Sequence, residues 1–220
     1  MGTYEPLTRA VLDSLLQPGV TFVDGGSNVG FDAIRASRFV GPSGAVFAVE
    51  PHPRICQVLR SNIESNGCSN VSALELALGE SEETAWLNTS DEPGSHSLGD
   101  ERSGGGHKVR VLPLDAVMGE RDIDVIKLDL EGSEMRALRG LAGVLAARRK
   151  PTLIIEFCSD WLRKRRIPPA EMLGFLRSHG YRVQAIDDGL REGPFDLDAH
   201  DDRLLGDREF NYNLVCQPRP

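Results

Sequence analysis

The chain has 220 residues, of which 40% are hydrophobic and 26% are charged, and its net charge at pH 7 is −8. This length suits one large α/β domain with a sizeable core. The acidic balance argues against a general binder of nucleic acid or anionic membranes, and no apolar run approaches the length of a membrane span.

Charged residues occupy the N-terminal segment, where a signal peptide needs an apolar core, so we expect a soluble, cytoplasmic protein. The cysteines are widely spaced and none forms a C-x-x-C pair. This pattern predicts reduced thiols with no metal or disulfide framework. The four are Cys56, Cys68, Cys158 and Cys216.

Residues 4–17 are predicted to form an opening helix, because apolar residues recur at helical spacing and Pro18-Gly19 follows. We therefore divide the chain into an N-terminal helical segment, 1–19, and a single domain, 20–220. The opening helix can either cover an active site or pack in a homodimer, and the sequence does not distinguish these arrangements.

A buried strand over 20–24 ends at Asp24 and is followed by a turn that contains Gly26, Asn28 and Gly30. Glycines let the backbone approach a ligand, and the first turn of the next helix presents free N–H groups to it. The acid suits a ligand with positive charge or with hydroxyl and ammonium donors. The glycine spacing fails the G-x-G-x-x-G pattern of dinucleotide sites. A turn without a ligand is the alternative.

A second buried strand, 45–49, ends at Glu50. An acid at this point of a strand–helix–strand unit binds the hydroxyls of a ribose in nucleoside sites. A surface glutamate without a role is the alternative. A third strand is predicted over 71–76, and right-handed crossovers put these strands in the order 3-2-1.

Residues 88–107 are polar and glycine-rich, and we predict a loop that is either functional or disordered. Its candidate substrate contacts are Ser95, His96 and Ser97. Val109, Val111 and Leu114 alternate as in an edge strand after this loop.

A fourth strand, 124–130, ends among the acids Asp129, Glu131 and Glu134, and a helix is predicted from Ser133 onward. Asp129 and Glu131 point to the same side if the strand persists through them. Carboxylates that cap the following helix are the alternative reading.

A fifth strand, 152–157, carries Glu156 at its end, and a basic run at 163–166 follows. A solvated face explains such a run more often than an anion site does. A sixth strand over 181–186, an acidic insertion at 187–209 and a last strand near 211–216 complete the pattern.

These stretches together resemble the class I S-adenosylmethionine-dependent methyltransferases, and within them the FkbM-like family. The resemblance covers roughly residues 20–186. It is carried by Val-Asp-Gly-Gly-Ser-Asn-Val-Gly at 23–30, Glu-Pro-His-Pro at 50–53, Leu-Arg-Ser-Asn at 59–62 with Asn66, Ala-Leu-Gly at 77–79, Gly-Ser-His-Ser-Leu at 94–98 and Lys-Leu-Asp-Leu-Glu-Gly-Ser-Glu at 127–134.

The resemblance implies a Rossmann-like α/β fold with helices on both faces of a mostly parallel seven-stranded sheet. The strand order would be 3-2-1-4-5-7-6, with the last strand antiparallel between the fifth and the sixth. It further implies cofactor-binding roles: Asp24 at the amino-acid end of the cofactor, Gly26, Asn28 and Gly30 along the turn, Glu50 at the ribose, Ala77 near the adenine, and Asp129 with Glu131 near the reacting sulfonium.

Methyl transfer is an in-line displacement, so alignment supplies much of the rate, and an alcohol acceptor also needs a base for its proton. The candidates for this base are His96, Asp129, Glu131 and Glu156, and chemistry favours His96. Family members commonly have Asn or Ser at that place, so this role does not come from the resemblance. Acceptor contacts are expected from Ser95, His96, Glu131 and Glu156. No metal is expected, because the fifth strand offers only Glu156.

We therefore predict O-methylation of a hydroxyl on a small molecule, a sugar or a polyketide-type natural product of secondary metabolism, with S-adenosylmethionine as the donor. The family association supplies that substrate class. An N-methyltransferase is the near alternative. A nicotinamide-dependent oxidoreductase is opposed by the glycine spacing and by Asp24, and a non-catalytic cofactor-binding module is the third alternative.

Overall fold

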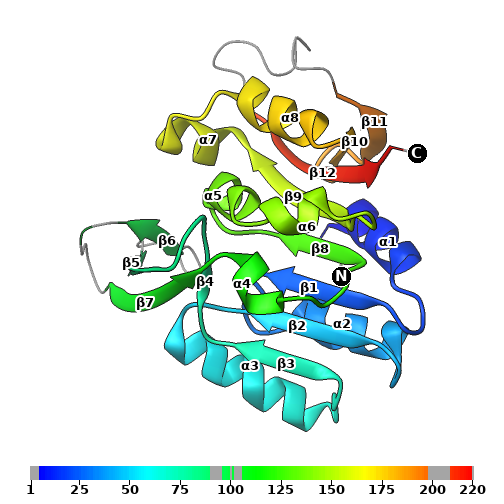
Figure 1. The fold of residues 1–220 in the computed structure, drawn as a ribbon, viewed down its shortest axis with the longest axis vertical. Coiled ribbons are helices and arrows are strands. Elements are labelled where there is room, and N and C mark those ends of the chain that lie inside the picture. The colour runs from blue at the N-terminus through cyan, green and yellow to red at the C-terminus, as the bar shows by residue number, and fades with distance from the viewer. Residues whose placement is uncertain (1–4, 90–95, 100, 102–105, 198–208, 220) are drawn as a thin grey trace.

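The structure is a computed structural model that describes residues 5–89, 96–99, 101, 106–197 and 209–219. In Figure 1 a large twisted sheet runs through the molecule, and a smaller sheet projects from its side. No helix among the described residues is long and apolar enough to cross a membrane.

The large sheet has eight strands in the order β11-β10-β12-β9-β8-β1-β2-β3. Five strands are parallel and apolar: β1 (Thr21–Gly25), β2 (Ala45–Val49), β3 (Val71–Leu74), β8 (Val125–Leu128) and β9 (Thr152–Cys158). Three pair antiparallel at one side: β10 (Tyr181–Asp187), β11 (Glu192–Asp196) and β12 (Asn211–Pro218). The seven predicted strands thus have the predicted order, with β12 inserted between β9 and β10, and β11 is an added edge strand within the acidic insertion.

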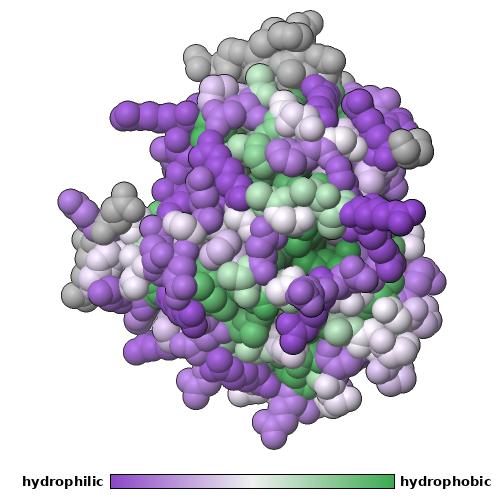
Figure 2. All heavy atoms as spheres, viewed as in Figure 1, coloured by the Kyte–Doolittle hydropathy of each residue, from purple (hydrophilic) through white to green (hydrophobic). Residues whose placement is uncertain are grey.

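Helices cover both faces of this sheet, because the strands are buried on both sides. Phe22 packs in the core beneath α1 (Pro6–Leu15), α2 (Phe31–Val40) and α3 (Pro53–Ser65), whereas its neighbour Val23 packs in the core on the other face. That second core is covered by α4 (Leu114–Met118), α5 (Glu134–Arg139), α6 (Ala142–Ala146), α7 (Ser159–Arg165) and α8 (Pro169–Ser178). Figure 2 shows hydrophobic residues gathered toward the middle of one face, with hydrophilic residues around them.

The small sheet has the order β4-β7-β5-β6, and it places residues 88–89, 96–99 and 107 of the loop predicted over 88–107 in strands. Its strands are β4 (Ala77–Leu78), β5 (Glu83–Thr89), β6 (His96–Gly99) and β7 (His107–Leu112). Strands β5 and β6 pair antiparallel, and Leu87 and Leu98 join Val109 and Val111 in a small apolar cluster. A single apolar residue in β6 made this strand hard to recognise in a polar stretch.

Two further predictions are wrong in detail. The helix expected to run on from Ser133 is interrupted at Gly140, whose missing Cβ would lie 2.0 Å from the carbonyl oxygen of Gly79. Strand β8 ends at Leu128 rather than near residue 130, so Asp129 and Glu131 belong to a turn. Glu131 has a φ of 49°, which is not strand geometry.

Candidate active site

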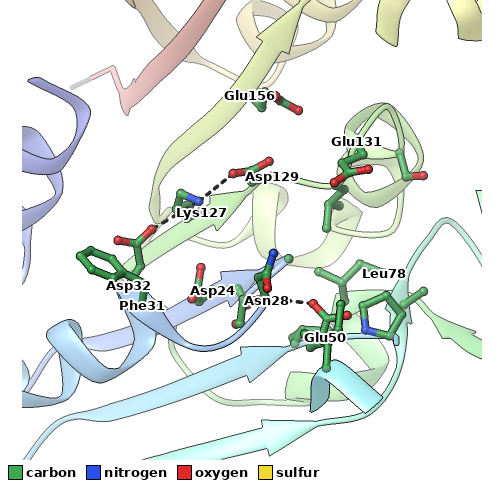
Figure 3. Close-up of a pocket in the computed structure, with 18 of the residues that line it drawn as sticks. Asp24, Asn28, Phe31, Asp32, Glu50, Leu78, Lys127, Asp129, Glu131 and Glu156 are labelled. Atoms are coloured by element: carbon green, nitrogen blue, oxygen red, sulfur yellow. Dashed lines mark hydrogen bonds and ion pairs between the residues drawn. The ribbon is translucent and has the colours of Figure 1, made fainter. Parts of the chain in front are cut away.

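A cavity of about 870 Å³ opens at the carboxyl ends of the central parallel strands. Residues at the carboxyl-terminal ends of four strands, or in the turns after them, line it: Gly26 and Asn28 after β1, Glu50 after β2, Asp129 and Glu131 after β8, and Glu156 in β9. This is the crevice in which open α/β sheets bind ligands. Figure 3 shows how these side chains converge from separate strands.

Asp24 lies near the end of the central strand β1 and is only 1% exposed. Its Oδ1 is buried without a hydrogen-bond partner. Burial raises the pKa of Asp24, and the nearby Lys127 ammonium opposes that rise. Because an unpaired buried acceptor is costly, this atom is suited to a donor brought by a ligand.

The turn after β1 depends on left-handed backbone at Gly26, Asn28 and Gly30, with φ values of 83°, 49° and 93°. A Cβ at Gly26 would lie 1.9 Å from the carbonyl oxygen of Asp129, so only glycine lets these segments meet. Gly30 precedes α2, and a Cβ there would lie 2.5 Å from Leu59 Cδ1. Gly26 and Asn28 line the cavity, whereas Gly30 shapes the start of the helix.

Glu50 is held between two backbone donors. Its Oε1 accepts from the N–H of His52 at 2.8 Å, and its Oε2 accepts from the N–H of Asn28 at 3.0 Å. Burial raises the pKa of Glu50 to about 7, against the opposing effect of these two bonds. Each carboxylate oxygen keeps further acceptor capacity, so the side chain can bind a diol without moving.

Lys127 also lines the cavity, but it is not among the site residues predicted from the sequence. It is 6% exposed, and its Nζ lies 3.1 Å from Asp129 Oδ2 and 3.4 Å from Asp32 Oδ2. Burial alone would lower the pKa of Lys127, but Asp129, Asp24 and Asp32 outweigh it and raise the pKa well above its usual value. A single lysine within the apolar run of β8 was the available signal.

The turn between β8 and α5 is fixed by Glu134. Its Oε1 accepts from the N–H groups of Leu130 at 2.7 Å and Gly132 at 3.2 Å. Burial raises the pKa of Glu134 to about 7. Both roles considered for this acidic cluster therefore occur in it. Glu134 binds backbone donors before α5, as expected of a helix-capping carboxylate, whereas Asp129 and Glu131 line the cavity.

Glu156 and Ser133 also line the cavity. Glu156 Oε2 and Ser133 Oγ are both buried without a hydrogen-bond partner. Burial, together with Asp129, Glu134 and Glu131, raises the pKa of Glu156 well above its usual range. Glu156 therefore holds its proton at neutral pH. Ser133, which the sequence identified only as a helix start, is 2% exposed and lines the cavity.

Four buried side-chain atoms in the described part of the chain have no hydrogen-bond partner, and all four belong to residues that line this cavity: Arg9 Nε, Asp24 Oδ1, Ser133 Oγ and Glu156 Oε2. Unsatisfied buried polar groups are rare in folded proteins. Their concentration here indicates a site built for a polar ligand with both donors and acceptors.

Other predicted residues are placed as follows. Ala77 is buried in β4 and lines the cavity. Ser95 lies outside the described residues, and so does the side chain of His96, whose backbone belongs to β6. Leu98 of the same strand lines the cavity, so β6 borders the site.

The basic run at 163–166 is structural where the contacts are described. Arg163 pairs with Asp160 at 2.6 Å, and Lys164 Nζ lies 4.3 Å from the centre of the Trp161 ring. Arg165 Nη2 donates to the carbonyl oxygen of Leu98 at 2.9 Å and so ties α7 to the small sheet.

The opening helix α1 contributes to the cavity wall through Thr8, Arg9 and Leu12. Within one chain, therefore, it covers the site, which is one of the two arrangements considered from the sequence. No group of three or more His, Cys, Asp or Glu side chains among the described residues is placed to hold a metal ion.

Comparison with known proteins gives a family match and structural neighbours. A family model described as "Methyltransferase FkbM domain" matches residues 24–183. An arsenite methyltransferase from Halobacterium salinarum is 40% identical over 65 residues, which is 30% of this chain and only 16% of that enzyme.

Two solved structures share the fold. A methyltransferase FkbM from Methylobacillus flagellatus has a TM-score of 0.53 at 18% identity, over 90% of this chain and 43% of that one. A SAM-dependent O-methyltransferase from Thermotoga maritima has a TM-score of 0.57 at 16% identity, over 100% of this chain and 67% of that one.

Proposed function

The chain belongs to the FkbM methyltransferase family, and from this premise we propose that it transfers a methyl group from S-adenosylmethionine to a hydroxyl of a small molecule. The observation that carries the proposal is the pair of buried carboxylates at adjacent strand ends in one cavity. Asp24 has an unpartnered oxygen, and Glu50 is pinned by two backbone N–H groups.

These residues fit the donor groups of the cofactor. Its amino-acid end carries an ammonium, which suits the unpartnered Asp24 oxygen, and its ribose carries two hydroxyls, which suit Glu50. Ala77 and Leu78 supply an apolar part of the cavity wall that suits the adenine ring. The cavity volume of about 870 Å³ lies in the range of small-molecule and cofactor sites, with room for a second molecule.

The bound cofactor supplies a methyl group on a sulfonium, which is open to attack from the opposite side. The protein's main task is therefore alignment, worth about 7–11 kcal/mol in well-oriented cases. The turn from Gly26 to Gly30 and the turn stapled by Glu134 fix the backbone on the two sides of the cavity. Lys127 holds Asp129 and Asp32 in place by ion pairs.

The acceptor hydroxyl loses its proton as the new bond forms. Glu156 is a poor base at neutral pH, because its raised pKa leaves it protonated, but it can donate a hydrogen bond to the acceptor. Asp129 is engaged by Lys127. We keep His96 as the proposed base, since its strand borders the cavity through Leu98, and Glu131, which lines the cavity, is the alternative. His96→Ala should lower turnover by about 10²–10⁴-fold, and near-normal turnover would reject this role.

The acceptor class, a sugar or a polyketide-type molecule, rests on the family association, and one structural neighbour is described as an O-methyltransferase. A nitrogen acceptor is the competing proposal. Mass spectrometry of the methylated product, with hydrolysis to release O-methyl or N-methyl species, separates the two. The proposal calls for no metal, so a chelator should leave turnover unchanged.

Thermal unfolding with and without ligands tests the cofactor. S-adenosylhomocysteine at 100 times its Kd should stabilise the fold by about 2.7 kcal/mol, which is a rise of about 5–10 °C for a chain of this size. NAD and NADP should give no rise. A rise with the nicotinamide cofactors alone, or with none of the ligands, would overturn the proposal.

A further inference from the structure

Part of the cavity wall comes from outside the segment that the family model matches. That segment is 24–183, whereas α1 precedes it and Asp188 follows it. The Asp188 carboxylate accepts from the N–H groups of Leu7 at 2.7 Å and Thr8 at 3.3 Å, and from Thr8 Oγ1 at 2.5 Å. The N-cap residue of α1, Glu5, makes no capping hydrogen bond with its side chain. Asp188, which is distant in the sequence, caps the helix instead and holds it over the cavity.

This arrangement presents Arg9 to the cavity. Arg9 Cζ lies 4.5 Å from the centre of the Phe31 ring, so the guanidinium makes a cation–π contact with this ring. Its Nε is buried without a hydrogen-bond partner. No carboxylate among the described residues lies within ion-pair distance of Arg9, which is unusual for a half-buried cation at a site rich in acids.

Arg9 and Lys127 are the cationic side chains among the described residues that line the cavity. Lys127 is already matched, because Asp129 and Asp32 lie within 3.4 Å of its Nζ. Arg9 is therefore the cation left for an anionic group of a ligand. A charge-assisted hydrogen bond to a carboxylate would satisfy its buried donor.

The position of Arg9 in the cavity indicates which anionic group of the ligand it would bind. Phe31 opens α2, and no side chain caps that helix at Gly30, so its N-terminus favours negative charge. Asp32 follows Phe31 and pairs with Lys127, which lies close enough to Asp24 to affect its pKa. Figure 3 shows Phe31, Asp32 and Asp24 toward one end of the cavity and Glu50 toward the other.

We propose that Arg9 binds the carboxylate of the cofactor's amino-acid end, across from Asp24, and that Asp188 positions it by holding α1 over the cavity. The inference rests on the proposed use of S-adenosylmethionine. An amino-acid end carries one ammonium and one carboxylate. Among the described residues, this end of the cavity offers Asp24 Oδ1 as an acceptor without a hydrogen-bond partner and Arg9 as a cation without a paired carboxylate. The opening segment is thus part of the cofactor site rather than an appendage to it.

The test is a comparison of two ligands by isothermal titration. S-adenosylhomocysteine has the carboxylate, and its decarboxylated analogue, S-adenosyl-3-thiopropylamine, lacks it. The wild-type protein should bind S-adenosylhomocysteine about 10–100-fold more tightly than the analogue, in line with a hydrogen bond to a charged group. Arg9→Gln should remove most of this preference by weakening only S-adenosylhomocysteine, and Arg9→Lys should keep part of it.

Arg35→Gln is the matched control, because Arg35 also lies over a phenylalanine ring, that of Phe39 at 5.3 Å, but it pairs with Asp13 and does not line the cavity. It should leave both affinities unchanged. The assignment is overturned if Arg9→Gln weakens both ligands equally, if it weakens neither, or if it raises only the acceptor's KM. If the wild-type protein binds neither ligand, the proposed function fails before Arg9 is in question.

Discussion

Replacing Glu50 with glutamine separates two effects of this carboxylate: its effect on the free energy of unfolding and its effect on the affinity for the cofactor. In the folded protein burial raises its pKa from 4.5 to about 7, while the residue is only 7% exposed. A shift of this size corresponds to about 3 kcal/mol of stability that is lost as the group ionises.

The sign follows from proton binding. Between pH 4.5 and about 7 the folded state holds the Glu50 proton while the unfolded chain has released it, so this group's contribution to stability falls as pH rises through that window. Glutamine cannot ionise. The stability of the wild type relative to Glu50→Gln should therefore fall by about 3 kcal/mol, or about 6–12 °C in midpoint, between pH 4.5 and pH 8.

Binding should change in the opposite sense. The carboxylate form is the one that accepts hydrogen bonds from a ribose diol, so wild-type affinity for S-adenosylhomocysteine should rise with pH through about 7. At pH 8 the glutamine variant should bind about 10–100-fold more weakly, because one oxygen is replaced by a donor and the charge is lost.

Thermal melts at several pH values, with and without S-adenosylhomocysteine, measure both effects. The reasoning is refuted if the midpoints of wild type and variant differ by the same amount at pH 5 and pH 8, or if the variant binds the ligand as tightly as the wild type.

Three further predictions concern the frame of the site. Lys127→Met should cost about 3–5 kcal/mol in urea unfolding, because it leaves the buried Asp24 and the half-buried Asp32 and Asp129 without their cation. Lys108→Met, at an exposed position of β7, should be nearly neutral, and equal losses would contradict the role of Lys127. Gly26→Ala should destabilise the protein more than Gly41→Ala, because both glycines have positive φ but only a Cβ at Gly26 would meet a backbone carbonyl, that of Asp129. The Gly41 variant should lose about 1 kcal/mol of stability. Similar losses in the two variants would argue against the contact with Asp129. Asp188→Ala should speed hydrogen exchange in α1, lower stability by about 0.5–2 kcal/mol and weaken S-adenosylhomocysteine binding. The control is Asp196→Ala, which removes an exposed ion pair with Arg182. Unchanged hydrogen exchange in α1 of the Asp188 variant would show that Asp188 does not hold this helix.

The order of the large sheet was predictable because its signals are local. Apolar strands that end at Asp24, Glu50 and Asp129 alternate with helices, and right-handed crossovers leave few ways to arrange them. The acids at or after the strand ends could be named for the same reason, since parallel strands that point one way bring their carboxyl ends to one edge. Glu5 and Asp32, which also line the cavity, lie on or beside helices and were not predicted.

The missed features depend on contacts between distant segments. Helix α5 ends before Gly140, where the backbone of Gly79 approaches closely, and nothing near Gly140 in the sequence predicts that contact. Asp188 caps a helix 181 residues away. Ser133, Lys127 and Arg9 become site residues only once the turn after β8, the core of the sheet and α1 are folded around one cavity.

The most direct test of the proposed cofactor site is a crystal structure of the protein with S-adenosylhomocysteine. We expect the ribose hydroxyls within hydrogen-bond distance of Glu50, the ammonium at Asp24 Oδ1 and the carboxylate at Arg9, without a change in the backbone of the turn from Gly26 to Gly30. A ligand bound in the reverse direction, or bound outside the cavity, would contradict this site.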